Sequence, residues 1–207
     1  MVDNDDDSIS DSYDQKIKIM IIGETLVGKT AIITRYTKKV FGETYLSTVG
    51  IDFQNKPLNI NGKKINVEIW DTAGQERFRN IAKNYFQSSD GFLLVYDITN
   101  KETFDKLNDW YDQIKTNAPE NSKCMIVGNK SDLEENRQVK KEEGEKFAND
   151  KNLKFYETSA KDDKNINIVF ETLSKEIVND EKTVKRNKRS SQVLKKKNTK
   201  VEKKNCC

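Results

Sequence analysis

Short apolar runs rich in β-branched residues alternate, through the middle of the chain, with longer segments whose apolar positions recur at helical spacing. Such alternation is typical of a parallel sheet covered by helices on both faces. The apolar runs predict strands at Lys16–Ile22, Ile51–Ile60, Lys63–Asp71, Gly91–Asp97, Lys123–Asn129 and Lys154–Glu157. The longer segments predict helices at Lys29–Thr37, Glu102–Thr116, Lys140–Asn149 and Ile166–Val178, with a short helix after Arg77.

The dipeptide Asn61-Gly62 separates the second and third predicted strands. Both residue types tolerate positive φ, so this pair favours a two-residue hairpin turn. We therefore expect one antiparallel pair in an otherwise parallel sheet of six strands. The fold class is α/β.

Charge divides the chain into three parts. The first 15 residues contain six Asp and no Lys or Arg, whereas the segment from Lys182 onward carries 11 Lys and Arg against one acid, Glu202. Like charges repel, and neither end offers much apolar surface to bury. We expect an acidic disordered extension over 1–15, one folded domain over 16–179, and a basic disordered tail over 180–207.

Several classes of site and location are excluded by composition. The chain has no His, which removes His-based catalysis and His metal ligands. Of its three Cys, Cys206 and Cys207 are adjacent, and Cys124 lies in an apolar strand where we expect an inert buried thiol. This usage predicts a reducing compartment. No apolar run approaches the ~18 residues of a membrane span, and the N-terminus resembles no signal segment.

A phosphate-binding motif follows the first predicted strand. The pattern GxxxxGK[ST] is filled by Gly23, Glu24, Thr25, Leu26, Val27, Gly28, Lys29 and Thr30. It opens a predicted helix, as the motif requires, so that backbone N–H groups converge on phosphate oxygens. Lys29 would supply charge to the β- and γ-phosphates, and the Thr30 hydroxyl would coordinate Mg²⁺.

A second motif, Trp70-Asp71-Thr72-Ala73-Gly74-Gln75, ends the third predicted strand. Taken alone, Asp71 is equally a strand-end turn carboxylate. Beside a P-loop, Asp71 is expected to reach the Mg²⁺ shell and the Gly74 N–H to bond the γ-phosphate. Gln75 would orient the attacking water as the catalytic residue.

Two further segments after strands can read a base. In Asn129-Lys130-Ser131-Asp132, the Asp132 carboxylate can accept from both N1–H and the 2-amino group of guanine, whereas adenine presents an acceptor there. The stem of Lys130 can cover one face of the base. After the last strand come Ser159, Ala160 and Lys161; the Ala160 N–H can bond guanine O6, and Lys161 can cover the other face.

Together these segments resemble the Ras superfamily, and most closely the Rab family, from about Lys16 to Val178. Ser47–Phe53 resembles the Rab switch I sequence, Trp70–Phe78 resembles switch II, and Cys206-Cys207 is similar to the Rab double-cysteine ending. The resemblance implies that Thr48 coordinates Mg²⁺ and bonds the γ-phosphate, and that Phe41 packs against guanine.

The resemblance also implies an aromatic triad that reports the switch state to effectors, made of Phe53, Trp70 and Tyr85. From the residues alone, these are equally core or surface aromatics.

By this resemblance the protein would be a guanine-nucleotide switch in vesicle trafficking that binds GTP or GDP with Mg²⁺ and hydrolyses GTP slowly. Arg77 and Arg79 are expected to be solvated, so an activating protein would supply the missing charge. The other implied partners are an exchange factor, effectors, a prenylation escort and a GDP-dissociation inhibitor. Prenylated Cys206 and Cys207 beside the basic tail would hold the protein on the cytoplasmic face of an intracellular membrane, cycling with the cytosol.

Two departures from the family pattern stand out. Leu26 replaces the usual Gly, Ser or Ala beside the phosphates, which affects the expected exchange and hydrolysis rates. Phe86–Ser89 replaces the usual Tyr-Arg-Gly-Ala, which affects partner choice.

Two alternative functions compete. In a nuclear or nucleic-acid-associated GTPase the basic tail would contact phosphates or act as an import signal, but the paired cysteines would then have no purpose, so no nucleic-acid partner is expected. A nucleotide-holding scaffold without hydrolysis is opposed by Gln75, Thr48 and Asp71.

Overall fold

The computed structural model describes residues 13–42, 51–72 and 85–180. Several sequence predictions lie outside these ranges: the two tails over 1–12 and 181–207, the short helix after Arg77, and the site residues Thr48, Gly74, Gln75, Cys206 and Cys207. Of the predicted disordered extension over 1–15, Gln15 is instead the first residue of the first strand, and Asp14 bonds Lys64.

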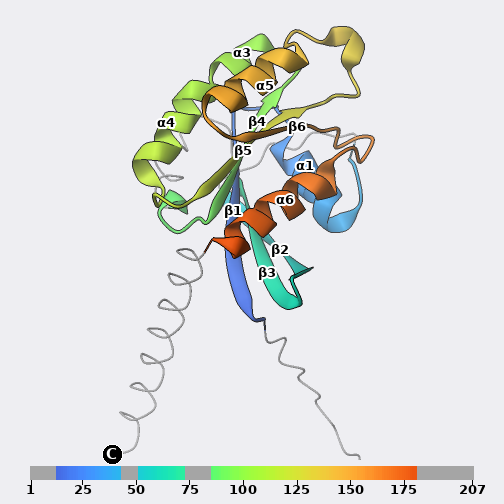
Figure 1. The fold of residues 1–207 in the computed structure, drawn as a ribbon. Coiled ribbons are helices and arrows are strands. Elements are labelled where there is room, and N and C mark those ends of the chain that lie inside the picture. Colours follow the sequence, from blue (N-terminus) through green and yellow to red (C-terminus); the bar gives the residue numbers. More distant parts are fainter. Residues whose placement is uncertain (1–12, 43–50, 73–84, 181–207) are drawn as a thin grey trace, which may run out of the picture.

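One mixed sheet organises the described part of the chain (Figure 1). Its strands are β1 (Gln15–Ile22), β2 (Ile51–Ile60), β3 (Lys63–Thr72), β4 (Gly91–Asp97), β5 (Lys123–Asn129) and β6 (Lys154–Glu157). Their order is β2-β3-β1-β4-β5-β6. Among these strands β2 and β3 pair antiparallel, and each other neighbouring pair is parallel. The predicted α/β class and hairpin are confirmed.

The hairpin turn has the chemistry that the sequence indicates. Asn61 and Gly62 lie at φ 53° and 75°, and Ile60 pairs directly with Lys63. Positive φ at both central residues matches the twist of the flanking strands, which fixes the register of β2 against β3.

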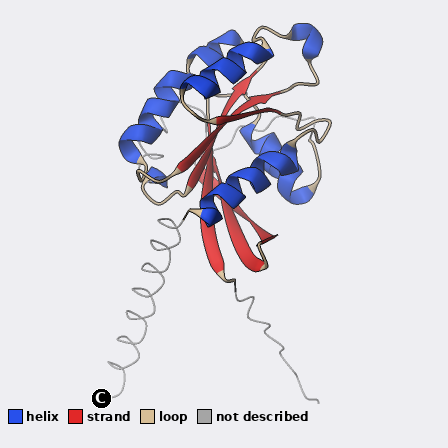
Figure 2. Ribbon diagram, in the orientation of Figure 1, coloured by secondary structure: helices blue, strands red, loops and turns tan. Residues whose placement is uncertain are grey.

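Helices cover both faces of the sheet (Figure 2). They are α1 (Lys29–Lys38), α3 (Lys101–Asp105), α4 (Leu107–Asn117), α5 (Lys141–Asp150) and α6 (Ile166–Asn179), with a short 3₁₀ turn η2 at Glu134–Asn136. No helix among the described residues is long and apolar enough to cross a membrane.

The prediction of one helix over Glu102–Thr116 is wrong in detail, because the segment breaks at Lys106, where ψ is −6°. Tertiary contacts give the reason. The Thr103 hydroxyl accepts from the Asp97 N–H at 3.0 Å, which anchors α3 to the end of β4. Helix α4 instead packs on the face of the sheet, where its Leu107, Trp110 and Ile114 are buried.

Alternate residues of β1 supply two separate cores. Ile17, Ile19 and Ile21 face α1 and α6, whereas Met20 and Ile22 face the core that includes α4. On the first face Phe170 stacks on Tyr36 with ring centroids 4.1 Å apart. Both faces of the central strands are thus sealed by apolar packing, as expected for parallel strands buried on each side.

The parallel strands place the loops that follow them at one edge of the sheet, where α/β proteins bind ligands. The P-loop follows β1, Asp71 ends β3, and the base-reading segments follow β5 and β6. The described chain ends at the opposite edge: Asp180, after α6, pairs at 2.7 Å with Lys123, the first residue of β5.

Candidate functional site

The P-loop depends on two glycines. Gly23 lies at φ 141°, and a Cβ there would come within 2.1 Å of the Val95 carbonyl oxygen. Gly28, at φ 93°, precedes α1, and its Cβ would come within 2.4 Å of the Asn129 amide nitrogen. No other residue fits either position without displacing backbone or the base-reading segment.

Lys29 lies inside this loop and is only 6% exposed. Its ammonium donates to the carbonyl oxygens of Gly23 at 2.9 Å and Glu24 at 2.8 Å. Burial lowers the pKa of Lys29 to about 8, although the charges of Asp71 and Glu24 oppose that shift. A desolvated cation wrapped by loop carbonyls is a strong site for an anion, since phosphate oxygens would relieve its lost solvation.

Two oxygen ligands of the kind that Mg²⁺ prefers lie beside Lys29. The Thr30 hydroxyl donates to Asp71 Oδ2 at 2.7 Å, and Asp71 is 6% exposed at the end of β3. The described residues contain no cluster of three or more His, Cys, Asp or Glu that could hold a metal. Mg²⁺ is usually held by one or two protein ligands together with substrate phosphates and waters, and Thr30 and Asp71 supply two such oxygens.

Asn129 joins the phosphate loop to the base-reading segments. Its buried side-chain amide donates to the Val27 carbonyl at 2.9 Å and its oxygen accepts from the Thr158 hydroxyl at 3.1 Å. It therefore links loops after β1, β5 and β6 through one side chain.

Lys130 and Asp132 are held in place from two sides. Lys130 lies at φ 68° and its ammonium pairs with Asp97 Oδ2 at 2.6 Å. Asp132 Oδ1 accepts from the Ser159 hydroxyl at 2.6 Å. A carboxylate can accept about four hydrogen bonds, so Asp132 keeps capacity for the two donors of guanine.

Arg35 of α1 contacts the other base-reading segment. Its guanidinium donates to the carbonyls of Ala160 at 2.7 Å and Lys161 at 2.9 Å, and lies 5.9 Å from the ring centre of Phe41. Phe41 is thereby near the loop that carries Ala160 and Lys161, as its predicted role requires.

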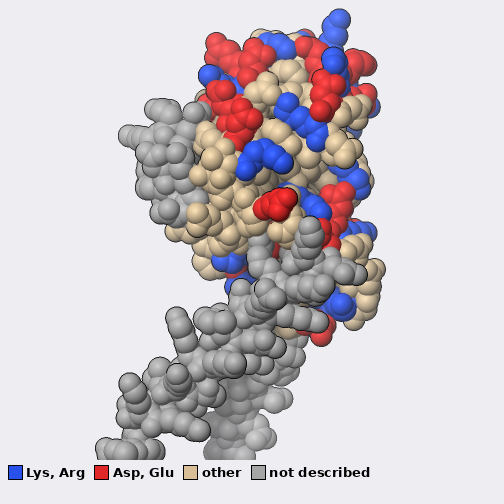
Figure 3. All heavy atoms as spheres, turned by 60° about the vertical axis from the view of Figure 1, so that its left-hand side comes forward, with Lys and Arg blue, Asp and Glu red and all other residues tan. Residues whose placement is uncertain are grey.

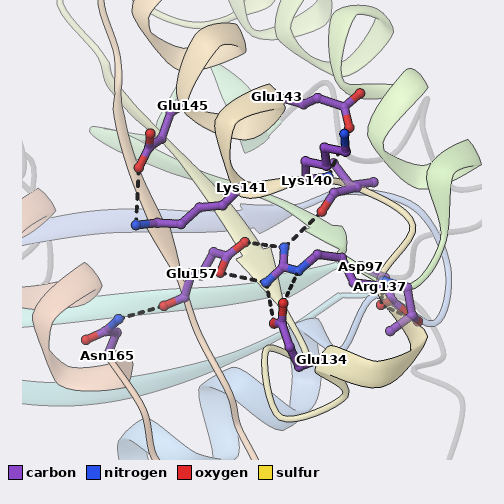
Figure 4. Close-up of polar contacts among 11 residues, drawn as sticks. Asp97, Glu134, Arg137, Lys140, Lys141, Glu143, Glu145, Glu157 and Asn165 are labelled. Atoms are coloured by element: carbon purple, nitrogen blue, oxygen red, sulfur yellow. Dashed lines mark hydrogen bonds and ion pairs between the residues drawn. The ribbon is translucent and has the colours of Figure 1, made fainter.

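A charged cluster fixes the end of β6 behind this loop (Figure 4). Arg137 bonds the carboxylates of Glu134 and Glu157, each at 2.7 Å at the closest, and the Asn165 amide donates to the Glu157 carbonyl. The hydrogen bonds that Arg137 donates to both carboxylates raise its pKa. Because Arg137 and Glu157 are largely buried, this bidentate pairing is expected to hold firmly.

Sequence reasoning missed Arg35, Asp97, Arg137 and Thr158. Asp97 had a usable signal, since it ends a buried strand that neighbours β1 and β5. Arg35 and Thr158 act through partners in distant segments, and Arg137 joins the nearby Glu134 to the distant Glu157, so no local pattern reveals these roles.

The predicted aromatic triad is brought together. Trp70 stacks on Phe53 with centroids 5.1 Å apart and meets Tyr85 at 4.8 Å. Phe53 is 48% exposed, so the group has a solvent-facing edge. The Trp70 indole donates to Glu68 at 2.9 Å, which orients the central ring.

The two departures from the family sequence pattern, at Leu26 and at Phe86–Ser89, differ in where they lie. Leu26 points outward, 58% exposed, at φ 67°, a conformation that costs a side-chain-bearing residue about 1–2 kcal/mol. In the second departure, Phe86 is fully buried and packs edge-on to Phe92, and Ser89 is buried too, whereas Gln87 and Ser88 are exposed, so it changes both the core and the surface.

Comparison with known proteins agrees with this geometry. Residues 18–179 match the Ras family. The chain is 46% identical over 167 residues to Ras-related protein Rab-8B from Homo sapiens, covering 81% of each chain. It is 45% identical over 166 residues to Ras-related protein Rab-8A from Bos taurus, covering 80% of each.

If Asn129 joins the loops as described, Asn129→Ala should leave the Val27 carbonyl and the Thr158 hydroxyl unpaired. Each such loss costs about 1–3 kcal/mol in a buried setting, so urea denaturation at fixed saturating GDP should show a stability loss of about 2 kcal/mol or more. Asn66→Ala, which removes an exposed bond to Asn55, is the matched control. Equal effects of the two substitutions would contradict the linking role.

Proposed function

This chain belongs to the Ras family and is a Rab small GTPase, a guanine-nucleotide switch in vesicle trafficking, and we propose that the edge formed by its P-loop, Asp71 and the two base-reading segments is where it binds and hydrolyses GTP. The observation that carries the assignment is the single hydrogen-bonded unit that Asn129 makes of the phosphate and base loops. A nucleotide spanning both would meet one preorganised surface.

In this proposal the P-loop, Gly23 through Thr30, cradles the phosphates with its N–H groups and the Lys29 ammonium. Ras-superfamily GTPases use Mg²⁺, and Thr30 and Asp71 supply oxygens that suit it, joined by Thr48 from outside the described residues. When bound, Mg²⁺ neutralises charge that develops on the phosphate oxygens.

The base would be read by Asp132, with Lys130 and Lys161 covering its faces, Phe41 at its edge and the Ala160 N–H at O6. Ser159 holds the Asp132 carboxylate from the opposite loop, which limits its rotation. Guanine then satisfies an acceptor that adenine cannot.

For hydrolysis we assign Gln75 to orient the water, and the N–H of Gly74 with Thr48 to sense the γ-phosphate. The described residues include two arginines, and both are already bonded: Arg35 to loop carbonyls and Arg137 to two carboxylates. An activating protein would therefore supply the missing positive charge, a contribution of up to ~10⁵ in rate.

Rab GTPases work through regulators and effectors, and we assign the solvent edge of Phe53, Trp70 and Tyr85 as an effector-binding surface. Its exposed Phe53 and oriented Trp70 support the assignment, because rigid aromatic rings make effective contact residues.

For membrane attachment we propose lipidated Cys206 and Cys207 with the basic segment from Lys182. An exchange factor, a prenylation escort and a GDP-dissociation inhibitor would complete the cycle between the cytosol and the cytoplasmic face of a membrane. On the face in Figure 3, the acidic and basic side chains of the described residues are mixed. Asp180 lies at the sheet edge opposite the P-loop, so a tail leaving there keeps the nucleotide site away from the bilayer.

Asp132→Asn tests the base assignment. The new amide offers a donor where guanine also donates, so affinity for GDP should fall by at least about 100-fold. Xanthosine diphosphate, which carries an acceptor oxygen at C2, should then bind better than GDP in a competition assay. Asp150→Asn, which alters an exposed pair with Lys146, should leave the preference unchanged. An Asp132→Asn protein that still preferred GDP would overturn the assignment.

Replacing both Cys206 and Cys207 by Ser tests the anchor. One lipid chain binds a membrane marginally, and two chains, or one with a basic patch, bind stably. The double variant should move to the soluble fraction while binding GTP normally. If it stays with membranes at moderate salt, a protein receptor rather than lipid holds it there.

A further inference from the structure

One P-loop side chain reaches out of the loop to a helix. The carboxylate of Glu24 accepts a hydrogen bond from the indole N–H of Trp110 on α4 at 2.9 Å. Its own backbone carbonyl accepts from the Lys29 ammonium. Glu24 therefore connects the helix to the buried cation through one residue.

Trp110 is well placed to fix that connection. Its side chain is 2% exposed and belongs to the core formed by β1, β4 and α4. A large ring packed on all sides has little freedom to follow a moving partner. The indole is a fixed donor, and its acceptor is an ionised group, which makes the bond stronger than one between neutral groups.

The position matters because Glu24 is an acid in a loop that binds anions. The Glu24 charge already acts on Lys29, whose pKa it raises against the effect of burial. A carboxylate free to turn toward the phosphates would repel them. While Trp110 holds the Glu24 carboxylate, Glu24 orients Lys29 through its backbone carbonyl.

We propose that Trp110 is a positioning residue for phosphate binding, acting through Glu24 on the geometry of the P-loop and Lys29. The inference rests on the proposed assignment of the P-loop as the phosphate site. It adds a determinant of nucleotide release that lies on α4, outside every nucleotide motif.

The first measurement is release of a fluorescent GDP analogue from full-length protein with Mg²⁺. Trp110→Phe keeps most of the packing and removes the donor, so release should be about tenfold faster, equivalent to about 1.4 kcal/mol. The matched control is Tyr111→Phe, the neighbouring aromatic on α4, whose ring faces Lys151; its release rate should stay within about twofold of the unaltered protein. Equal rates for the two variants would overturn the proposal.

A double-mutant cycle separates positioning from packing. In a Glu24→Ala background the indole has lost its carboxylate acceptor, so adding Trp110→Phe should change release by less than about twofold. The β-phosphorus resonance of bound GDP should shift in Trp110→Phe alone and not in Tyr111→Phe. A tenfold effect in both backgrounds would show that Trp110 acts by packing only.

If Trp110→Phe does not fold, the Trp110 indole N–H resonance gives a second readout. It should move upfield in Glu24→Ala and stay in place in Tyr111→Phe; no movement in Glu24→Ala would overturn the proposal. Failure of the P-loop assignment itself would appear separately, as unchanged GDP binding in Lys29→Ala.

Discussion

The buried ammonium of Lys29 is the interaction on which the rest of the site depends. Removing a cation from water is costly unless the protein returns equivalent contacts. Here the carbonyls of Gly23 and Glu24 return part of them, and Asp71 adds a favourable charge. Two glycines at positive φ allow the loop to close around the ammonium. In the proposed function, the anionic oxygens of a phosphate supply the remaining contacts that the ammonium needs.

In the proposed site, the residues that would recognise guanine are bonded directly to this loop. The Asn129 side chain bonds the P-loop at Val27 and the segment after β6 at Thr158. It also fills the space that a side chain at Gly28 would need. Behind the base segments, Arg137 and Glu157 hold β6 against the loop after β5. Movement of one motif would therefore displace the others, as expected in a protein whose bound nucleotide sets its conformation.

The sequence could predict the strands and the position of the motif loops because short-range rules govern both. Alternating apolar runs set the strands, Asn61-Gly62 sets the one antiparallel turn, and parallel strands gather the motif loops at one edge. The break at Lys106 could not be predicted, since it follows from the contact of Thr103 with the end of β4. The contacts of Arg35 and Trp110 could not be predicted either, because their hydrogen-bond partners lie 125 and 86 residues away along the chain.

The central claim, that one preorganised edge binds a guanine nucleotide, is tested most directly by competition on the unaltered full-length protein. With Mg²⁺ present, GTP and ATP are titrated separately against a bound fluorescent GDP analogue. A site built around an acceptor for guanine should reject adenine by about 10⁴-fold, so GTP should displace the analogue at a concentration lower by that factor. Displacement by ATP at concentrations comparable with those of GTP would contradict the account.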